Sequence, residues 1–174
     1  MPGTSNKFST ISLIGMPGSG KSTVGVILAK LTGLRFRDTD LDIQVREHAT
    51  LQDILEQRGY RYLRSLEEQV ILAVDLEDAV IATGGSAVYS EACMRRLHRA
   101  GPLVYLEADL GTLERRVAAA PMRGIASEPH RSFADVYAER TPLYRRHAAL
   151  TVDATTGSAD EIAEHILSRL GARQ

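Results

Sequence analysis

The sequence predicts an α/β fold in which a parallel β-sheet carries helices on both faces. Five short apolar or β-branched segments are each followed by a segment with helical character, the order that parallel strands with crossover helices require. The chain has 174 residues, of which 44% are hydrophobic and 25% are charged. These values are typical of one globular domain with a sizeable core, so we expect residues 1–174 to form a single domain.

In the first half of the chain, strands are predicted where apolar and β-branched residues gather, and helices where apolar residues recur every three or four positions. Gly33 is expected to end the first helix. Thr50 and Asp53 form a capping box before a third helix, which should end near Gly59. The predicted strands are residues 9–14, 34–38 and 79–83, and the predicted helices are residues 24–31, 41–48, 50–59 and 60–76.

In the second half, side chains that can cap a helix mark most of the boundaries. Asp109 and Ser132 are expected to cap helices, and Ser158 and Glu161 form a capping box before the last helix. Pro142 lies inside a predicted helix and suggests a kink or a restart there. The predicted strands are residues 103–106 and 150–153, and the predicted helices are residues 90–99, 110–120, 133–147 and a last one from residue 159.

The composition argues against several classes of protein. The formal net charge of −1 creates no overall attraction to nucleic acid or to a membrane, and no apolar run is long enough to span a bilayer. The polar residues 1–7 contain no apolar signal core, so we expect a cytoplasmic protein. The single cysteine, Cys93, is interpreted as a small half-buried packing residue, and the five histidines lack metal-ligand spacing.

Residues 15–23, Gly-Met-Pro-Gly-Ser-Gly-Lys-Ser-Thr, match the phosphate-loop pattern and lie between a predicted strand and a predicted helix. Glycines let backbone N–H groups come close to a phosphate, and the helix that starts here directs its positive end at the anion. Lys21 is expected to reach the β- and γ-phosphates of a nucleotide, and the Ser22 hydroxyl to bind Mg²⁺. The alternative is a glycine-rich turn with a chance lysine, and the order of strand, loop and helix argues against it.

Two carboxylates, Asp38 and Asp40, follow at the end of the second predicted strand. Alternate side chains of an extended segment share a face, so both acids are expected to point toward the crevice at the carboxyl ends of the strands. The alternative is that Asp40 caps the next helix. Because capping needs only one acid, the phosphate loop upstream favours a functional pair.

Three further features each have two interpretations. The glycines at residues 84–85 let a ligand or a second backbone come close, or they form a tight strand-to-helix turn, and both can hold together. Residues 121–131, which contain Arg123, form either a lid or a plain surface loop. Arg64 lies four residues before Glu68, so spacing alone explains it as half of a solvated ion pair.

These parts together favour a kinase for a small acceptor. A phosphate loop indicates a nucleoside triphosphate and Mg²⁺, whereas the Asn-Lys-x-Asp segment with which GTPases read guanine is missing from the sequence. ATPases that drive motion usually belong to much larger chains. Arginines can offset the charge of a transferring phosphoryl group and clamp an anionic substrate. Asp40 can accept a hydrogen bond from an acceptor hydroxyl and orient it.

The chain resembles the shikimate kinase family over about residues 11–170. The later matching segments are weak alone, but their order and spacing together are specific. They are the phosphate loop at residues 15–23, Asp-Thr-Asp at 38–40, Leu-Arg-Ser-Leu-Glu at 63–67, Thr-Gly-Gly at 83–85, Arg123, and Arg-Thr-Pro-Leu-Tyr at 140–144.

The resemblance implies ATP-dependent phosphorylation of the 3-hydroxyl of shikimate, a step toward chorismate and the aromatic amino acids. It implies a three-layer, nucleoside-monophosphate-kinase-like phosphate-loop fold with strand order 2-3-1-4-5. It also implies substrate-binding helices at about residues 41–76 and a mobile lid at residues 121–131.

The same resemblance assigns roles to single residues. The catalytic residues it implies are Lys21, Asp40 and Arg123. The ATP-binding residues it implies are Gly18, Ser19, Gly20, Lys21, Ser22, Thr23, Arg123, and Arg116, which stacks on adenine. For the substrate it implies Asp40 at the hydroxyls, Arg64 and Arg140 at the carboxylate, and Gly84 and Gly85 at the ring. Ser22 is implied as the Mg²⁺ ligand, with Asp38 supporting the metal through water.

Two positions depart from the family pattern. Ser86 stands where a third glycine is usual, so its side chain either crowds the acceptor or offers it a new hydrogen bond. Gly-Ile-Ala at residues 124–126 follows Arg123 where Pro-Leu-Leu is usual, which loosens the hinge of the lid. Two alternatives remain open: a kinase of this architecture for a quinate- or gluconate-like acid, and a nucleotide-binding homologue without transfer activity. We expect a monomer that binds neither nucleic acid nor membrane.

Overall fold

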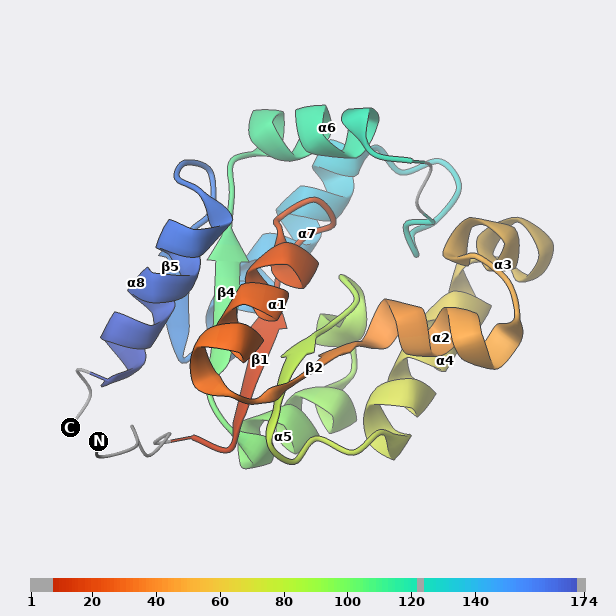
Figure 1. Ribbon diagram of the computed structural model, residues 1–174. Coiled ribbons are helices and arrows are strands. Elements are labelled where there is room, and N and C mark those ends of the chain that lie inside the picture. The colour runs from red at the N-terminus through yellow and green to blue at the C-terminus, as the bar shows by residue number, and fades with distance from the viewer. Residues whose placement is uncertain (1–7, 122–123, 172–174) are drawn as a thin grey trace.

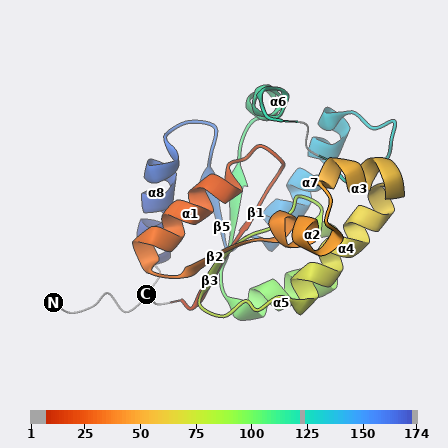
Figure 2. The ribbon, with the colours of Figure 1, turned by 45° about the vertical axis from the view of Figure 1, so that its right-hand side comes forward.

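The structure, a computed structural model, describes residues 8–121 and 124–171. Five parallel strands form one sheet in the order β2-β3-β1-β4-β5, which confirms the predicted fold class and strand order. Helices cover both faces of this sheet (Figures 1 and 2). The strands are β1 (Thr10–Ile14), β2 (Arg35–Asp38), β3 (Ala79–Ala82), β4 (Leu103–Glu107) and β5 (Leu150–Asp153).

The helices follow the predicted order, with one short addition after β3. That addition is the 3₁₀ turn η1 (Ala87–Tyr89). The α-helices are α1 (Lys21–Thr32), α2 (Thr39–Glu47), α3 (Leu51–Arg58), α4 (Tyr60–Ala73), α5 (Glu91–Ala100), α6 (Leu110–Ala119), α7 (Phe133–His147) and α8 (Ala159–Gly171). None of the helices in the described ranges is long and apolar enough to cross a bilayer.

Three apolar clusters hold these elements together. One packs α1 and α8 on a face of the sheet, with Leu13 and Leu28 among its buried residues. A second packs α5 and α7 on the opposite face, with Leu97 and Tyr144 among its buried residues. The third joins α2, α3 and α4 to Ala126, and so fixes these helices beside the carboxyl ends of the strands. Such burial is the main favourable contribution to folding.

Several predicted caps and ends of helices are confirmed. Thr50 and Asp53 form both hydrogen bonds of a capping box. The Asp109 and Ser132 side chains accept from backbone N–H groups at the starts of α6 and α7. Gly33 ends α1 with a φ of 73°, a left-handed conformation that favours glycine.

Four predictions about local structure are wrong. The first residue of α2 is Thr39, and its cap is Asp38 rather than Asp40. Helix α4 ends at Ala73, because Val74 is extended and the Arg96 guanidinium takes up carbonyl groups of the last turn. Helix α7 continues through Pro142, so the helix does not restart there. Cys93 is fully buried rather than half-buried.

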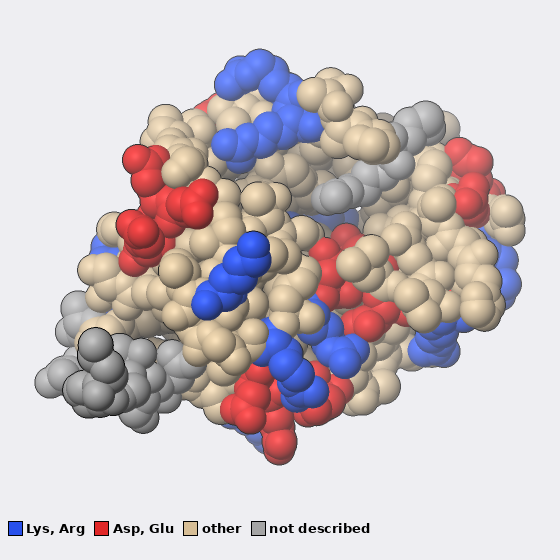
Figure 3. Space-filling model, viewed as in Figure 1, with Lys and Arg blue, Asp and Glu red and all other residues tan. Residues whose placement is uncertain are grey.

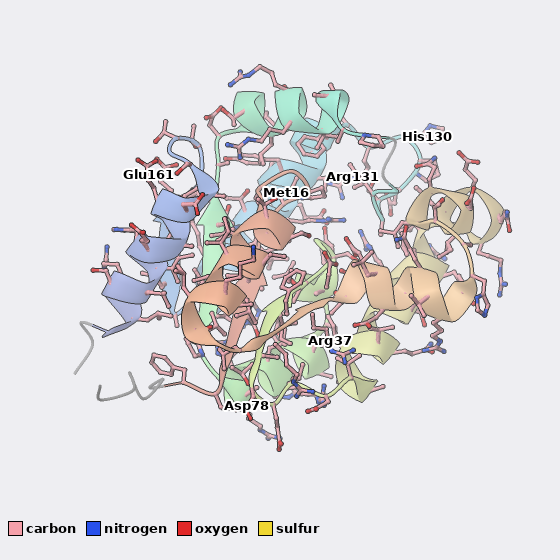
Figure 4. The ribbon with its side chains drawn as sticks, in the orientation of Figure 1. Met16, Arg37, Asp78, His130, Arg131 and Glu161 are labelled. Atoms are coloured by element: carbon pink, nitrogen blue, oxygen red, sulfur yellow. The ribbon has the colours of Figure 1, made fainter. Side chains whose placement is uncertain are left out.

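The sheet places the phosphate loop at one end of the molecule. Met16, just after β1, and Asp78, just before β3, lie at opposite ends of the sheet (Figure 4). The loops that follow β1, β2 and β3 therefore meet at the same edge, where open parallel sheets bind their ligands.

Candidate active site

A cavity of about 400 Å³ lies at the carboxyl ends of the strands, and the surface is hollowed there below α6 (Figure 3). Most of the predicted site residues line this cavity. These are Gly18, Ser19, Gly20, Lys21, Ser22, Thr23, Asp40, Gly85, Arg116 and Arg140. Three others contact lining residues without lining the cavity themselves: Asp38, Arg64 and Gly84. Arg123, the predicted lid arginine, lies outside the described residues.

The phosphate loop forms the donor half of the cavity. Gly18 and Gly20 have φ angles of 83° and 94°, which a residue with a side chain rarely adopts. Helix α1 begins at Lys21, so its unpaired N–H groups face the loop. The buried Lys21 ammonium donates to the Gly15 carbonyl at 2.8 Å and to the Met16 carbonyl at 2.9 Å. The loop's own backbone oxygens thus hold the lysine where phosphate oxygens would bind.

The two predicted carboxylates lie in different positions and make different contacts in the structure. The Ser22 hydroxyl donates to Asp38 Oδ2 at 2.5 Å, while Asp38 Oδ1 accepts from the Asp40 N–H at 3.0 Å. Asp40 lies in the first turn of α2 and lines the cavity. The prediction that both acids share the face of an extended strand is therefore wrong, because the helix starts between them. A hydroxyl and a carboxylate oxygen side by side are hard oxygen donors of the kind that Mg²⁺ prefers.

Arg116 lies across the mouth of the donor half. Its guanidinium donates to the Ala154 carbonyl at 2.9 Å and is within 3.4 Å of the Gly18 carbonyl. These contacts join α6 to the phosphate loop and to the turn after β5. The planar group is thereby held beside the nucleotide side of the cavity, where it can stack on a base.

Two arginines define the acceptor half. Arg64 Nε donates to the Ala126 carbonyl at 3.0 Å, and Arg140 Nη2 donates to the same oxygen at 2.8 Å. Arg64 therefore does not form the expected ion pair with Glu68. Arg140 is only 1% exposed, yet no carboxylate of the described residues lies within ion-pair distance of it. A buried guanidinium held only by neutral oxygens is ready to receive an anion.

Two tyrosines that sequence reasoning missed hold this half in place. The Arg64 guanidinium lies 4.2 Å from the centre of the Tyr89 ring, and Arg140 Nε donates to the Tyr89 hydroxyl at 3.3 Å. The Tyr144 hydroxyl donates to the Gly85 carbonyl at 2.5 Å. Tyr144 belonged to the segment that carries the family resemblance, whereas nothing in the local sequence marks Tyr89.

The glycines after β3 allow close approach by side chains. A Cβ built on Gly84 would lie 2.9 Å from Asp40 Oδ1 and would overlap the Glu67 carboxyl group. A Cβ on Gly85 would lie 2.9 Å from Arg140 Nη1. A larger residue at either position would displace side chains that line the cavity, while the approach of a ligand to these glycines stays a prediction.

Glu67 is a buried acid that sequence reasoning did not select. It is 4% exposed, and burial, followed by the nearby Asp40 charge, raises its pKa to about 8. The Ser86 hydroxyl donates to Glu67 Oε2, whereas Glu67 Oε1 has no hydrogen-bond partner among the described residues. The sequence does indicate that Glu67 is buried, because this residue falls on the apolar stripe formed by Leu63, Leu66 and Val70.

Comparison with known proteins shows which family the chain belongs to. Residues 17–171 match the family model described as shikimate kinase. The chain belongs to the shikimate kinase family. It is 39% identical to the shikimate kinase of Mycobacterium avium over 163 residues, 92% of each chain, and 35% identical to shikimate kinase 2 of Salmonella paratyphi B over 159 residues, 88% of each chain.

A solved structure with the same fold extends this comparison. The shikimate kinase of Acinetobacter baumannii in complex with shikimate matches with a TM-score of 0.85 and 31% identity. The match covers 97% of this chain and 96% of that one. The resemblance found in the motifs is thus confirmed over nearly the whole chain.

Proposed function

We propose that this protein is a shikimate kinase, which transfers the γ-phosphoryl group of ATP to the 3-hydroxyl of shikimate and releases ADP. Family membership supports the kinase activity. One observation carries the choice of acceptor: Arg64 and Arg140 converge on a single oxygen in the cavity that also contains the phosphate loop and Asp40. A hydroxylated carboxylate is the kind of molecule that suits both groups.

The acceptor would bind through its two kinds of polar group. Its carboxylate replaces the Ala126 carbonyl between Arg64 and Arg140, because an anion gains more from two guanidiniums than a neutral carbonyl does. Its hydroxyls then face Asp40, which holds and orients the one that attacks. Gly84 and Gly85 leave room for the ring beside Asp40.

The donor would bind along the phosphate loop. The backbone N–H groups of residues 18–23 surround the β- and γ-phosphates, and Lys21 turns from its own loop carbonyls to the phosphate oxygens. Ser22 would hold Mg²⁺ directly and Asp38 through water, and the bound ion would offset phosphate charge. Arg116 would stack on adenine. The contact of Arg123 with the transferring phosphoryl group rests on the family resemblance alone.

The proposal extends to larger parts of the chain. Residues 41–76 would be the substrate-binding helices, residues 121–131 the lid, and the whole chain one kinase domain. The monomeric state and the lack of binding to nucleic acid or membrane stay predictions. The cytoplasmic location stays a prediction.

Coupled assays of ADP release with shikimate, quinate and gluconate test the proposal. We expect brisk turnover with shikimate and little with the other two acids. Turnover with quinate or gluconate but not with shikimate would move the proposal to another acceptor. ATP binding without transfer to any acid would indicate an inactive homologue.

A substitution of Asp40 tests the mechanism. Asp40→Asn is expected to lower turnover by about 10²–10⁴-fold, because an amide cannot take the proton of the attacking hydroxyl. Calorimetric titration should show ATP affinity nearly unchanged. Unchanged turnover would mean that another group orients the hydroxyl.

A further inference from the structure

Ser86 adopts a backbone conformation that needs no glycine. Its φ of −90° and ψ of −3° lie outside the left-handed region that favours glycine, so a side chain fits where the family pattern has glycine. Ser86 is 6% exposed and lines the cavity. Its hydroxyl does not point at the acceptor, because it is bonded to Glu67. In this structure the Ser86 hydroxyl is therefore engaged by a neighbouring side chain.

Glu67 lies at the centre of the acceptor half. A Cβ on Gly84 would overlap Glu67 Oε1 and lie 2.9 Å from Asp40 Oδ1, so these two oxygens flank the same glycine. Oε1 is buried, and residues 8–121 and 124–171 supply no hydrogen-bond partner for it. The Glu67 carboxyl therefore borders the space that the hydroxyls of the acceptor would enter.

The bond to Ser86 decides where this carboxyl group lies. A buried carboxyl group without partners is costly, and Ser86 is the side chain that partners Glu67 within the part of the chain that the structure describes. With a glycine or an alanine at position 86, the carboxyl group would lose this donor, and the Ala87 N–H would be its remaining one. The Glu67 side chain would then be free to turn toward Asp40, Arg140 or water.

We propose that Ser86 is a positioning residue for the acceptor: its hydroxyl holds the Glu67 carboxyl against Gly84 and beside Asp40, and this geometry sets how tightly the hydroxylated face of the substrate binds. The inference rests on the proposed function, since it concerns the acceptor of that reaction. It assigns Ser86 no contact with the reacting atoms.

Steady-state kinetics of Ser86→Ala and Ser86→Thr test this inference. We expect Ser86→Ala to raise the KM for shikimate by about tenfold, the effect of one lost hydrogen bond to a buried carboxyl group. The KM for ATP and kcat should change by less than about twofold, because the phosphate loop is untouched. Ser86→Thr keeps the hydroxyl and should restore the KM for shikimate.

A double-mutant cycle tests whether Ser86 acts through Glu67. In a Glu67→Gln background, adding Ser86→Ala should change the KM for shikimate far less than it does in the wild type, because the two residues act as one unit. Equal effects in both backgrounds would overturn the proposal.

Ser90→Ala is a matched control for stability. Ser90 caps α5 through the Cys93 N–H at 3.2 Å and does not line the cavity, so its loss should lower Tm without changing the KM for shikimate. If Ser86→Ala, like the control, lowers Tm and leaves the KM for shikimate unchanged, the role of Ser86 is only structural and the proposal fails. A wild-type enzyme without shikimate turnover would instead refute the proposed function.

Discussion

The donor and acceptor halves of the cavity both contain positively charged side chains, but the carbonyl groups that hold these side chains lie at different distances along the chain. In each half, backbone carbonyl oxygens hold a buried cation. Lys21 is held by Gly15 and Met16, which are six and five residues away in the same loop. Arg64 and Arg140 are held by Ala126, which is 62 and 14 residues away from them. The donor half is a local structure, whereas the acceptor half is assembled from distant segments.

This difference determines what must move when ligands bind. In the donor half, one lysine side chain can turn from carbonyl to phosphate oxygens within a fixed loop. In the acceptor half, the Ala126 carbonyl itself lies between the arginines, and Ala126 is also packed into the apolar cluster of α2, α3 and α4. Binding of a carboxylate there is coupled to the position of residues 124–126.

A large effect on turnover is expected in the donor half. Lys21→Met should lower turnover by about 10²–10³-fold, because one preorganised charge at the phosphates is lost. The KM for shikimate should change little, since Lys21 belongs to the donor half. Lys30→Met, on the exposed side of α1, is the control and should leave turnover unchanged. A large rise in the shikimate KM of Lys21→Met would show that the two halves are not separate.

A somewhat smaller effect is expected at the arginine pair. Arg140→Lys keeps the charge but loses the planar fork, so the KM for shikimate should rise about 10- to 100-fold while the KM for ATP stays constant. Arg61→Lys, an exposed position in α4, is the matched control. Equal increases in both KM values would mean that Arg140 supports the whole cavity rather than the acceptor half.

Gly124 offers a way to displace the Ala126 carbonyl without changing an arginine. A Cβ on Gly124 would lie 2.6 Å from the Leu51 carbonyl oxygen, and backbone atoms cannot yield cheaply. Gly124→Ala should therefore displace residues 124–126. The KM for shikimate should fall by about threefold, because the Ala126 carbonyl would no longer compete with the carboxylate for the two arginines. Gly171→Ala, which meets nothing within 4 Å, is the control. A higher KM would show that the seated segment helps to bind the acid.

The smallest effect is expected for Glu67→Gln, in the pH dependence of the stability of the folded protein. Its pKa is about 8 in the folded protein against an ordinary value of 4.5, so between these values the folded state keeps a proton that the unfolded state releases. Its contribution to stability is therefore present below pH 4.5 and is lost as the pH rises toward 8. Urea midpoints between pH 5 and pH 8 should fall less for Glu67→Gln than for the wild type. Identical pH dependence in both proteins would place the titration elsewhere.

The same contrast explains how much could be predicted from sequence. The phosphate loop, the capping boxes and the five strands depend on neighbouring residues, so local patterns were enough for them. Asp38 as the cap of α2 was missed because both acids looked alike in the sequence. Glu67 was missed although it interrupts an apolar stripe, and the partners of Arg64 and Arg140 depend on contacts across the fold. Only the family resemblance selected these two arginines.

A crystal structure of the enzyme with shikimate is the most direct test of the carboxylate site between Arg64 and Arg140. We expect the carboxylate of the acid between Arg64 and Arg140, with its oxygens within hydrogen-bond distance of both guanidiniums and the Ala126 carbonyl displaced. The phosphate loop should keep its conformation. If shikimate binds elsewhere and the Ala126 carbonyl stays bonded to both arginines, the acceptor half of this account is contradicted.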